Sequence, residues 1–221
     1  MNNKILIALE GADCAGKSSI IEKLKIVLPI IYPNKKFLFT REPGNLLSEN
    51  NKSEEIREKL LTNKDLSVKE QAELFAESRK YHTQEIVNKI NEGYIIITDR
   101  YLLSSLVYQR TDVETDDLFE MNKESCDLLN NNKIKLENIV FKISKETYDK
   151  RMENREEDKD AMEDVALEQV YQRIADFNSM YNGEELKNID NNRTLTIDAN
   201  GDDYSRIFID TLYRIDKILN D

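Results

Sequence analysis

Short apolar runs alternate along the chain with longer segments whose apolar residues recur every three or four positions. The runs predict buried β-strands at residues 4–9, 36–40, 94–98, 138–143 and 193–197. The segments between them predict helices at residues 18–28, 53–61, 67–91, 102–109, 116–129, 145–152, 166–181 and 203–219. Because strands that alternate with helices are joined by crossover connections, the pattern predicts an α/β fold with a five-stranded parallel sheet between two layers of helices.

The length of 221 residues suits one domain, and no linker or repeat divides residues 1–221. Residues 153–164 interrupt the apolar pattern with seven acidic residues against two basic ones. We expect this segment to be a short lid within the domain, or else a solvated hinge before the next helix. An acidic lid closing over an anionic ligand is electrostatically unexpected.

Lys and Arg total 32 and Asp and Glu total 43, which gives a net charge of −11. A negative chain disfavours nucleic acid and anionic membranes as partners, because both require a broad basic face. No apolar stretch approaches the length of a membrane span. Two cysteines are too few for a disulfide framework, which favours a cytoplasmic protein. Small anionic ligands remain possible.

The strongest motif follows the first predicted strand and opens the first predicted helix. Residues 11–18, Gly-Ala-Asp-Cys-Ala-Gly-Lys-Ser, match G-x-x-x-x-G-K-[ST]. Gly11 and Gly16 allow the backbone N–H groups, with the positive end of the helix dipole, to converge on phosphate oxygens. Lys17 then reaches the β- and γ-phosphates, and Ser18 ligates Mg²⁺. This phosphate-binding loop predicts the fold of P-loop NTPases, and alone it fits a GTPase, an ATPase, a kinase or a nucleotide-gated module.

Two more polar clusters end the second and third predicted strands. They are residues 40–44, Thr-Arg-Glu-Pro-Gly, and residues 98–101, Thr-Asp-Arg-Tyr. Since ligands bind at the carboxyl ends of parallel strands, Arg41, Asp99 and Arg100 are expected to meet Lys17 at one edge of the sheet. Two Arg and one Lys exceed the need of one triphosphate and indicate a second phosphate, on an acceptor. A GTPase is disfavoured, because no Asn/Thr-Lys-x-Asp motif follows a later strand.

These motifs resemble those of the thymidylate kinase family over nearly the whole chain. The resemblance includes the P-loop in the form Gly-x-Asp-x-Ala-Gly-Lys-Ser, the Thr-Arg-Glu-Pro-Gly segment and residues 99–105, Asp-Arg-Tyr-Leu-Leu-Ser-Ser. It also includes residues 56–61 and 74–79, the pair Tyr108-Gln109 and a last strand followed by Ala199. The resemblance implies a kinase that transfers a phosphoryl group from ATP to dTMP, with Mg²⁺, as a homodimer.

The resemblance also implies roles for individual residues. Catalytic groups would be Lys17, Asp99, Arg100 and Arg155, with Ser18 and Asp99 at the metal. The ATP side would comprise Gly11, Ala15, Gly16, Lys17, Ser18, Ser19 and Ala199. The dTMP side would comprise Asp13, Arg41, Phe75, Arg79, Arg100, Ser105, Tyr108 and Gln109. Arg41 and Arg100 would clamp the phosphate, Asp13 would accept from the sugar 3′-OH, and Phe75 would stack on thymine.

Two departures from the family pattern matter. Cys14 stands where many members have Arg, so the catalytic cation must come from the lid, with Arg155 as the first candidate and Arg151 as the second. Residues 44–46, Gly-Asn-Leu, replace the usual Gly-Gly-Thr. These departures leave open a related kinase acting on another deoxynucleotide or a deoxynucleoside, and a non-catalytic nucleotide-binding regulatory protein. His82, the single histidine, is interpreted as structural.

Overall fold

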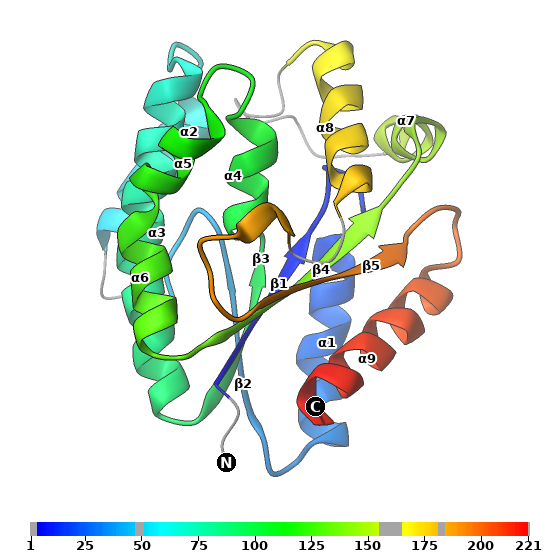
Figure 1. Ribbon diagram of the computed structural model, residues 1–221. Helices are drawn as coiled ribbons and strands as arrows, with labels where there is room; N and C mark the ends of the chain where they lie inside the picture. The colour runs from blue at the N-terminus through cyan, green and yellow to red at the C-terminus, as the bar shows by residue number, and fades with distance from the viewer. Residues whose placement is uncertain (1–3, 47–50, 155–164, 181–183, 221) are drawn as a thin grey trace.

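The computed structural model describes residues 4–46, 51–154, 165–180 and 184–220 (Figure 1). Its strands are β1 (Ile5–Glu10), β2 (Lys36–Arg41), β3 (Tyr94–Asp99), β4 (Lys135–Lys142) and β5 (Asn192–Asp198). They form one sheet in the order β2-β3-β1-β4-β5, and every adjacent pair is parallel. The predicted α/β fold with a five-stranded parallel sheet is therefore confirmed.

Helices cover both faces of this sheet. Their bounds are α1 (Lys17–Ile31), α2 (Asn51–Thr62), α3 (Val68–Asn91), α4 (Leu102–Tyr108), α5 (Thr115–Met121), α6 (Lys123–Asn131), α7 (Lys145–Glu153), α8 (Leu167–Ser179) and α9 (Tyr204–Asn220), with a 3₁₀ turn at Glu184–Leu186. Helices α1 and α9 lie on one side of the sheet, and α3 and α6 lie on the other (Figure 1). The arrangement gives the three layers that the alternating pattern predicts.

The central strand β1 explains why the hydrophobic pattern was easy to interpret. All six of its residues are buried, because β3 and β4 flank it and helices cover both of its faces. Such a strand appears in the sequence as a continuous apolar run. The edge strand β2 is only partly buried. The ends of β1, β2 and β3 thus lie side by side at one edge of the sheet.

The prediction of a single helix at residues 116–129 is wrong, because the structure has two helices that meet at Asn122. The Asn122 side chain turns inward and is 2% exposed. Its Nδ2 donates to the carbonyl of Leu118 at 2.7 Å, and its Oδ1 accepts from Arg79 Nη1 at 2.5 Å. The helix breaks where a buried partner on α3 requires a polar side chain. Strand β4 also begins earlier than expected, at Lys135.

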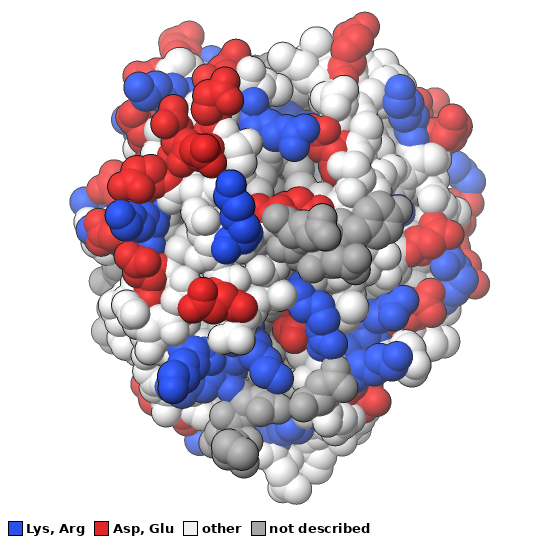
Figure 2. All heavy atoms as spheres, in the orientation of Figure 1, with Lys and Arg blue, Asp and Glu red and all other residues white. Residues whose placement is uncertain are grey.

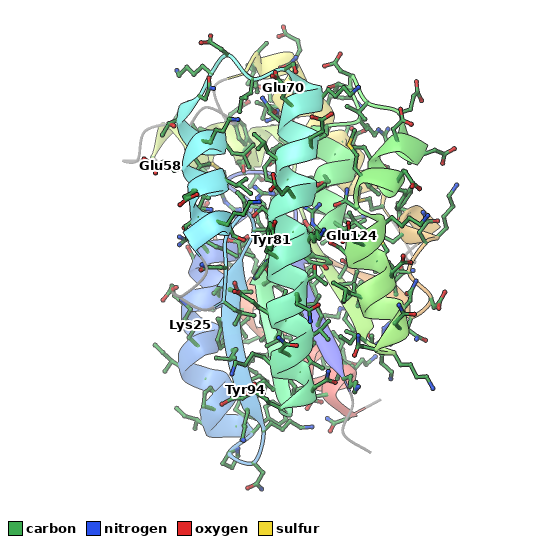
Figure 3. All side chains as sticks on the ribbon, turned by 90° about the vertical axis from the view of Figure 1, so that its left-hand side faces the viewer. Lys25, Glu58, Glu70, Tyr81, Tyr94 and Glu124 are labelled. Atoms are coloured by element: carbon green, nitrogen blue, oxygen red, sulfur yellow. The ribbon has the colours of Figure 1, made fainter. Side chains whose placement is uncertain are left out.

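Helices α2, α3 and α6 stand beside one another on the outer face (Figure 3). Ion pairs and hydrogen bonds connect them: Lys52 of α2 donates to the Tyr81 hydroxyl of α3 at 2.9 Å, and Lys80 lies 2.7 Å from Glu124 of α6. Ser67 and Glu70 form a reciprocal capping box at the start of α3. This face therefore presents a polar surface across three aligned helices.

Charged side chains of both signs cover the face shown in Figure 2, with acidic groups gathered near α5. The acidic cluster agrees with the negative net charge of the chain. Within the described ranges, every helix is too short or too polar to cross a bilayer.

Candidate active site

The phosphate-binding loop joins β1 to α1 in a tight curl. Positive φ angles occur at Gly11 (141°), Cys14 (60°) and Gly16 (90°). A Cβ atom at Gly11 would lie 2.7 Å from the carbonyl oxygen of Phe141 in β4, so only glycine fits there. The loop opens directly into the first turn of the fifteen-residue helix α1. Because the first N–H groups of a helix have no partner within the helix, this loop is suited to an anion.

Lys17 lies at the base of this loop. Its Nζ donates to the carbonyls of Gly11 and Ala12, each at 3.0 Å. Burial lowers the pKa of Lys17 to about 8, and the nearby Arg100 guanidinium adds to this shift. The lysine is thus a desolvated cation whose protonation responds to the charge placed beside it.

Ser18 and Asp99 form a pair of oxygen donors beside the loop. Ser18 Oγ donates to Asp99 Oδ2 at 3.2 Å. The other oxygen, Asp99 Oδ1, is buried and has no hydrogen-bond partner among the described residues. Hydroxyl and carboxylate oxygens are the ligands that Mg²⁺ prefers, with water and phosphate completing its shell. The donor set fits Mg²⁺, although no group of three or more His, Cys, Asp or Glu suited to a metal occurs in the described ranges.

Asp13, Arg100 and Tyr108 form a second polar group across the loop. The Arg100 guanidinium pairs with Asp13, donates to the Gly11 carbonyl at 2.8 Å and lies 5.0 Å from the centre of the Tyr108 ring. The Tyr108 hydroxyl donates to Asp13 Oδ2 at 2.9 Å. Burial alone would raise the pKa of Asp13, but Arg100 and Lys17 outweigh it and lower that pKa. Asp13 is therefore a carboxylate at neutral pH.

Arg79 is buried at the far end of the site, with 2% of its surface exposed. Its Nε donates to Glu42 at 2.7 Å, and its Nη2 donates to Ser105 Oγ at 3.0 Å. Since Asn122 takes a third N–H, two of the five guanidinium N–H groups remain for another acceptor. Gln109 is equally buried, and its Oε1 accepts no hydrogen bond from the described residues.

Arg41 lies at the entrance rather than in the interior. Its side chain is 58% exposed and sits 3.8 Å from Glu54 of α2. The next peptide bond, Glu42–Pro43, is cis, and the Pro43 carbonyl accepts from Arg57 Nη1 at 2.7 Å. The loop after β2 is thus fixed to α2, with the Arg41 guanidinium facing the opening.

These groups line one cleft of about 410 Å³. Its walls include these predicted site residues: Asp13, Gly16, Lys17, Ser18, Ser19, Arg41, Phe75, Arg79, Asp99, Arg100, Ser105, Tyr108 and Gln109. Gly11 and Ala15 shape the loop from behind without lining the cleft, and Ala199 is buried beside it. Arg155 and most of the predicted lid, residues 155–164, lie outside the described residues.

Sequence reasoning gave Arg151 of α7 only a secondary place, although it is a wall of the cleft. Its guanidinium donates to the carbonyls of Cys14 at 2.9 Å, Ala199 at 2.7 Å and Gly201 at 2.8 Å. It also lies 5.1 Å from the centre of the Tyr204 ring, and Tyr204 lines the cleft without having been predicted. Both residues reach the site from the C-terminal half of the chain, and no sequence motif marks either of them.

Glu10 was also missed. It is fully buried, and it accepts from the Tyr101 N–H at 2.8 Å and from Ser104 Oγ at 2.6 Å. Burial raises the pKa of Glu10, and the bond from Ser104 opposes that rise. Glu10 therefore fixes the turn that carries Arg100, whose φ is 67°. An acidic residue at the end of an apolar strand was the available signal.

A phosphate loop at the end of the central strand, which shares one cleft with Arg41, Arg79 and Arg100, defines a P-loop nucleotide-binding protein. The family model described as thymidylate kinase matches residues 9–202. The chain belongs to the thymidylate kinase family.

Individual relatives agree with the family match. A thymidylate kinase of Campylobacter hominis is 35% identical over 207 residues, which cover 90% of this chain and 93% of that protein. A thymidylate kinase of Mycoplasma mobile is 45% identical over 108 residues, which is 48% of this chain and only 50% of the relative's length. The crystal structure of thymidylate kinase from Ehrlichia chaffeensis has a TM-score of 0.66 at 17% identity, covering 96% of this chain and 98% of that chain. This last likeness concerns the fold.

Proposed function

We propose that this protein phosphorylates dTMP to dTDP with ATP. The observation that carries the proposal is the single cleft that joins the phosphate loop to the buried pair Arg79 and Gln109. One end suits a triphosphate, and the other offers a donor and an acceptor for a base. Family membership supports ATP as the phosphoryl donor.

In the proposed reaction an oxygen of the dTMP phosphate attacks the γ-phosphorus of ATP. The new P–O bond forms as the bond from the γ-phosphorus to the β,γ-bridging oxygen breaks, and ADP leaves. The dTMP phosphate is largely dianionic at neutral pH, with a second pKa of about 6, so no general base is required. Catalysis then rests on in-line positioning and on neutralising charge between two anions. Lys17 stabilises the transferred group, and Arg41 and Arg100 hold the acceptor phosphate.

Mg²⁺ would be held by Ser18 and Asp99 together with phosphate oxygens. When bound, it neutralises charge on the β- and γ-phosphates and orients them. The unpaired, buried Asp99 Oδ1 supports this assignment. The hydrogen bond from Ser18 to Asp99 keeps both oxygens in place.

The base end favours thymine over cytosine. Phe75, one helical turn before Arg79, is half-buried in the cleft wall and stacks on the ring. The two remaining Arg79 N–H groups donate to a base carbonyl, and the unpaired Gln109 Oε1 accepts from a ring N–H. Ser105 is part of the same polar wall. Cytosine would set an amino group against the Arg79 donors and would lack the ring N–H, so both contacts fail.

The sugar would lie between these ends. Asp13, kept ionised by its neighbours, accepts from the 3′-OH. The Tyr108 ring, held by its bond to Asp13, packs under the sugar and disfavours a ribose 2′-OH. Arg100 pairs with Asp13 and would turn in part toward the acceptor phosphate.

The nucleotide side would use the loop with Gly11, Ala15, Gly16 and Ser19, and Ala199 beside the adenine. Arg155 stays a prediction as the catalytic cation, as does a lid at residues 153–164 within one domain. Arg151 is the second candidate for the catalytic cation, and its contact with the Cys14 carbonyl at 2.9 Å supports this role. A homodimer and a cytoplasmic location also remain predictions from the sequence.

A coupled assay for ADP release with dTMP, dUMP, dCMP, dGMP and thymidine as acceptors tests the proposal. We expect turnover with dTMP to exceed turnover with dCMP by at least about 100-fold, because two polar contacts are lost. Preference for another acceptor would contradict the assignment to dTMP. Tight ATP binding without turnover on any acceptor would instead indicate a regulatory nucleotide-binding protein.

A further inference from the structure

Three buried charged or titratable side chains lie at the base end of the cleft, where Glu42 and Arg79 line the wall and His82 contacts Glu42. Glu42 follows β2, and Arg79 and His82 lie one turn apart on α3. His82 is 0% exposed, Arg79 2% and Glu42 6%. Buried charges are costly unless every one is paired and hydrogen-bonded. A surface ion pair would serve stability at lower cost, so this arrangement calls for an explanation.

The contacts form a chain from β2 to Arg79. His82 Nε2 lies 2.8 Å from Thr40 Oγ1, and His82 Nδ1 lies 3.3 Å from Glu42 Oε1. The other carboxylate oxygen, Glu42 Oε2, accepts from Arg79 Nε at 2.7 Å. The Glu42 carboxylate is therefore fixed from both sides, by the imidazole and by the guanidinium.

The series of contacts from Thr40 through His82 and Glu42 helps to set the orientation of the Arg79 guanidinium plane. Nε is anchored by Glu42, and the two terminal nitrogens are anchored by Ser105 and Asn122. A guanidinium is planar, so loss of the Nε anchor would allow the whole plane to tilt about the two contacts that remain, those to Ser105 and Asn122. Thr40 also contacts the Asn45 carbonyl at 3.2 Å, which connects His82 to the loop after β2.

We propose that His82 is a positioning residue that, through Glu42, orients Arg79 for discrimination of the acceptor base. The imidazole holds the Glu42 carboxylate in one rotamer, and the carboxylate holds the guanidinium with two donors toward the cleft. Without the ring, Glu42 gains rotational freedom, and Arg79 is held by Ser105 and Asn122 alone, so its donors are oriented less precisely. This inference rests on the proposed function, since it concerns recognition of the dTMP base.

Three substitutions separate positioning from simple core filling. His82→Leu removes both polar contacts while keeping an apolar side chain of moderate size. In His82→Asn the amide nitrogen takes roughly the place of Nδ1 and keeps the bond toward Glu42. In His82→Gln the amide nitrogen takes roughly the place of Nε2 and keeps only the bond toward Thr40. If His82 only fills the core, all three variants should lose stability without any change in the preference for dTMP.

The experiment measures steady-state kinetics with dTMP and dCMP for the wild-type protein and these variants, and thermal unfolding for each. For His82→Leu and His82→Gln we expect the KM for dTMP to rise by at least about tenfold, with the KM for ATP unchanged. The ratio of kcat/KM for dTMP to that for dCMP should fall by about tenfold. His82→Asn should stay within about threefold of the wild type, because the Glu42 contact persists.

Thr211→Val is the matched control, because Thr211 is also fully buried and, among the described residues, its side chain hydrogen-bonds within its own helix α9, at the Ile207 carbonyl. It should lower stability without changing the dTMP preference. If His82→Leu does not fold, Glu42→Gln gives the same reading, since it removes the carboxylate from the same chain. Equal behaviour of the Asn and Gln variants, or an unchanged dTMP preference in His82→Leu or Glu42→Gln, would overturn this inference. A wild-type protein that does not phosphorylate dTMP would instead contradict the proposed function.

Discussion

The Lys17 ammonium is buried at the phosphate loop, where burial and Arg100 lower its pKa to about 8. Bound phosphates favour the protonated form, so they raise this pKa. Below about pH 8 the lysine is already protonated, whereas above it ATP binding must take up a proton. We therefore expect ATP affinity to fall as pH rises above this value, by at most about tenfold per pH unit. Calorimetry in buffers of different ionisation enthalpy measures both the affinity and the proton uptake.

Lys25 provides the control for the prediction on Lys17. It lies on the same helix α1, is exposed, and bonds to Glu22 at 2.6 Å. Lys25→Met should leave the pH profile of ATP binding unchanged, whereas Lys17→Met should abolish most of the binding. An affinity that stays constant from about pH 7 to about pH 10 would show that Lys17 does not titrate in this range.

The helix α7 brings Arg151 to the nucleotide side by a route that no motif reveals. The guanidinium bridges the phosphate loop at Cys14 and the loop after β5 at Ala199 and Gly201. We expect Arg151→Met to raise the Kd for ATP by at least about tenfold, because both loops lose their shared donor. Arg151→Lys should recover only part of this loss, since an ammonium cannot match the planar fork. Titration calorimetry with ATP gives the Kd directly.

Lys150 is the natural comparison on the same helix. It precedes Arg151, is exposed, and pairs with Asp202 rather than with the phosphate loop. Lys150→Met should bind ATP like the wild type. If Arg151→Met also binds ATP with unchanged affinity, Arg151 has no part in nucleotide binding and the positive charge must come from another residue.

Elements were predictable where their signal is local. The buried strand β1 was recognised because both of its faces are apolar, and the P-loop because its glycines adopt conformations that other residues resist. The break between α5 and α6 was missed because the residue at the break, Asn122, bonds to Arg79, which lies 43 residues away in the sequence. The helical periodicity of the sequence continues through Asn122 and does not indicate that contact.

The sheet topology explains why many of the residues that line the cleft could be predicted. Parallel strands deliver their following loops to one edge, so Lys17, Arg41 and Asp99 could be brought together from the strand pattern alone. The burial of Arg79 could not be predicted from the strand pattern. Arg79 is enclosed by Glu42, Ser105 and Asn122 from three separate segments, and only the folded chain brings these together.

The continuous cleft leads to a prediction for the molecule as a whole. The phosphate loop and the Arg79 end line the same cavity of about 410 Å³. A compound that joins adenosine and thymidine through a chain of phosphates should therefore occupy both ends at once. Its second contact becomes intramolecular, so we expect it to bind at least about 100-fold more tightly than dTMP alone. Calorimetry, with the matching compound that carries cytidine instead of thymidine as control, measures this gain. Equal affinity of the two compounds would mean that the base end at Arg79 is not reached together with the phosphate loop.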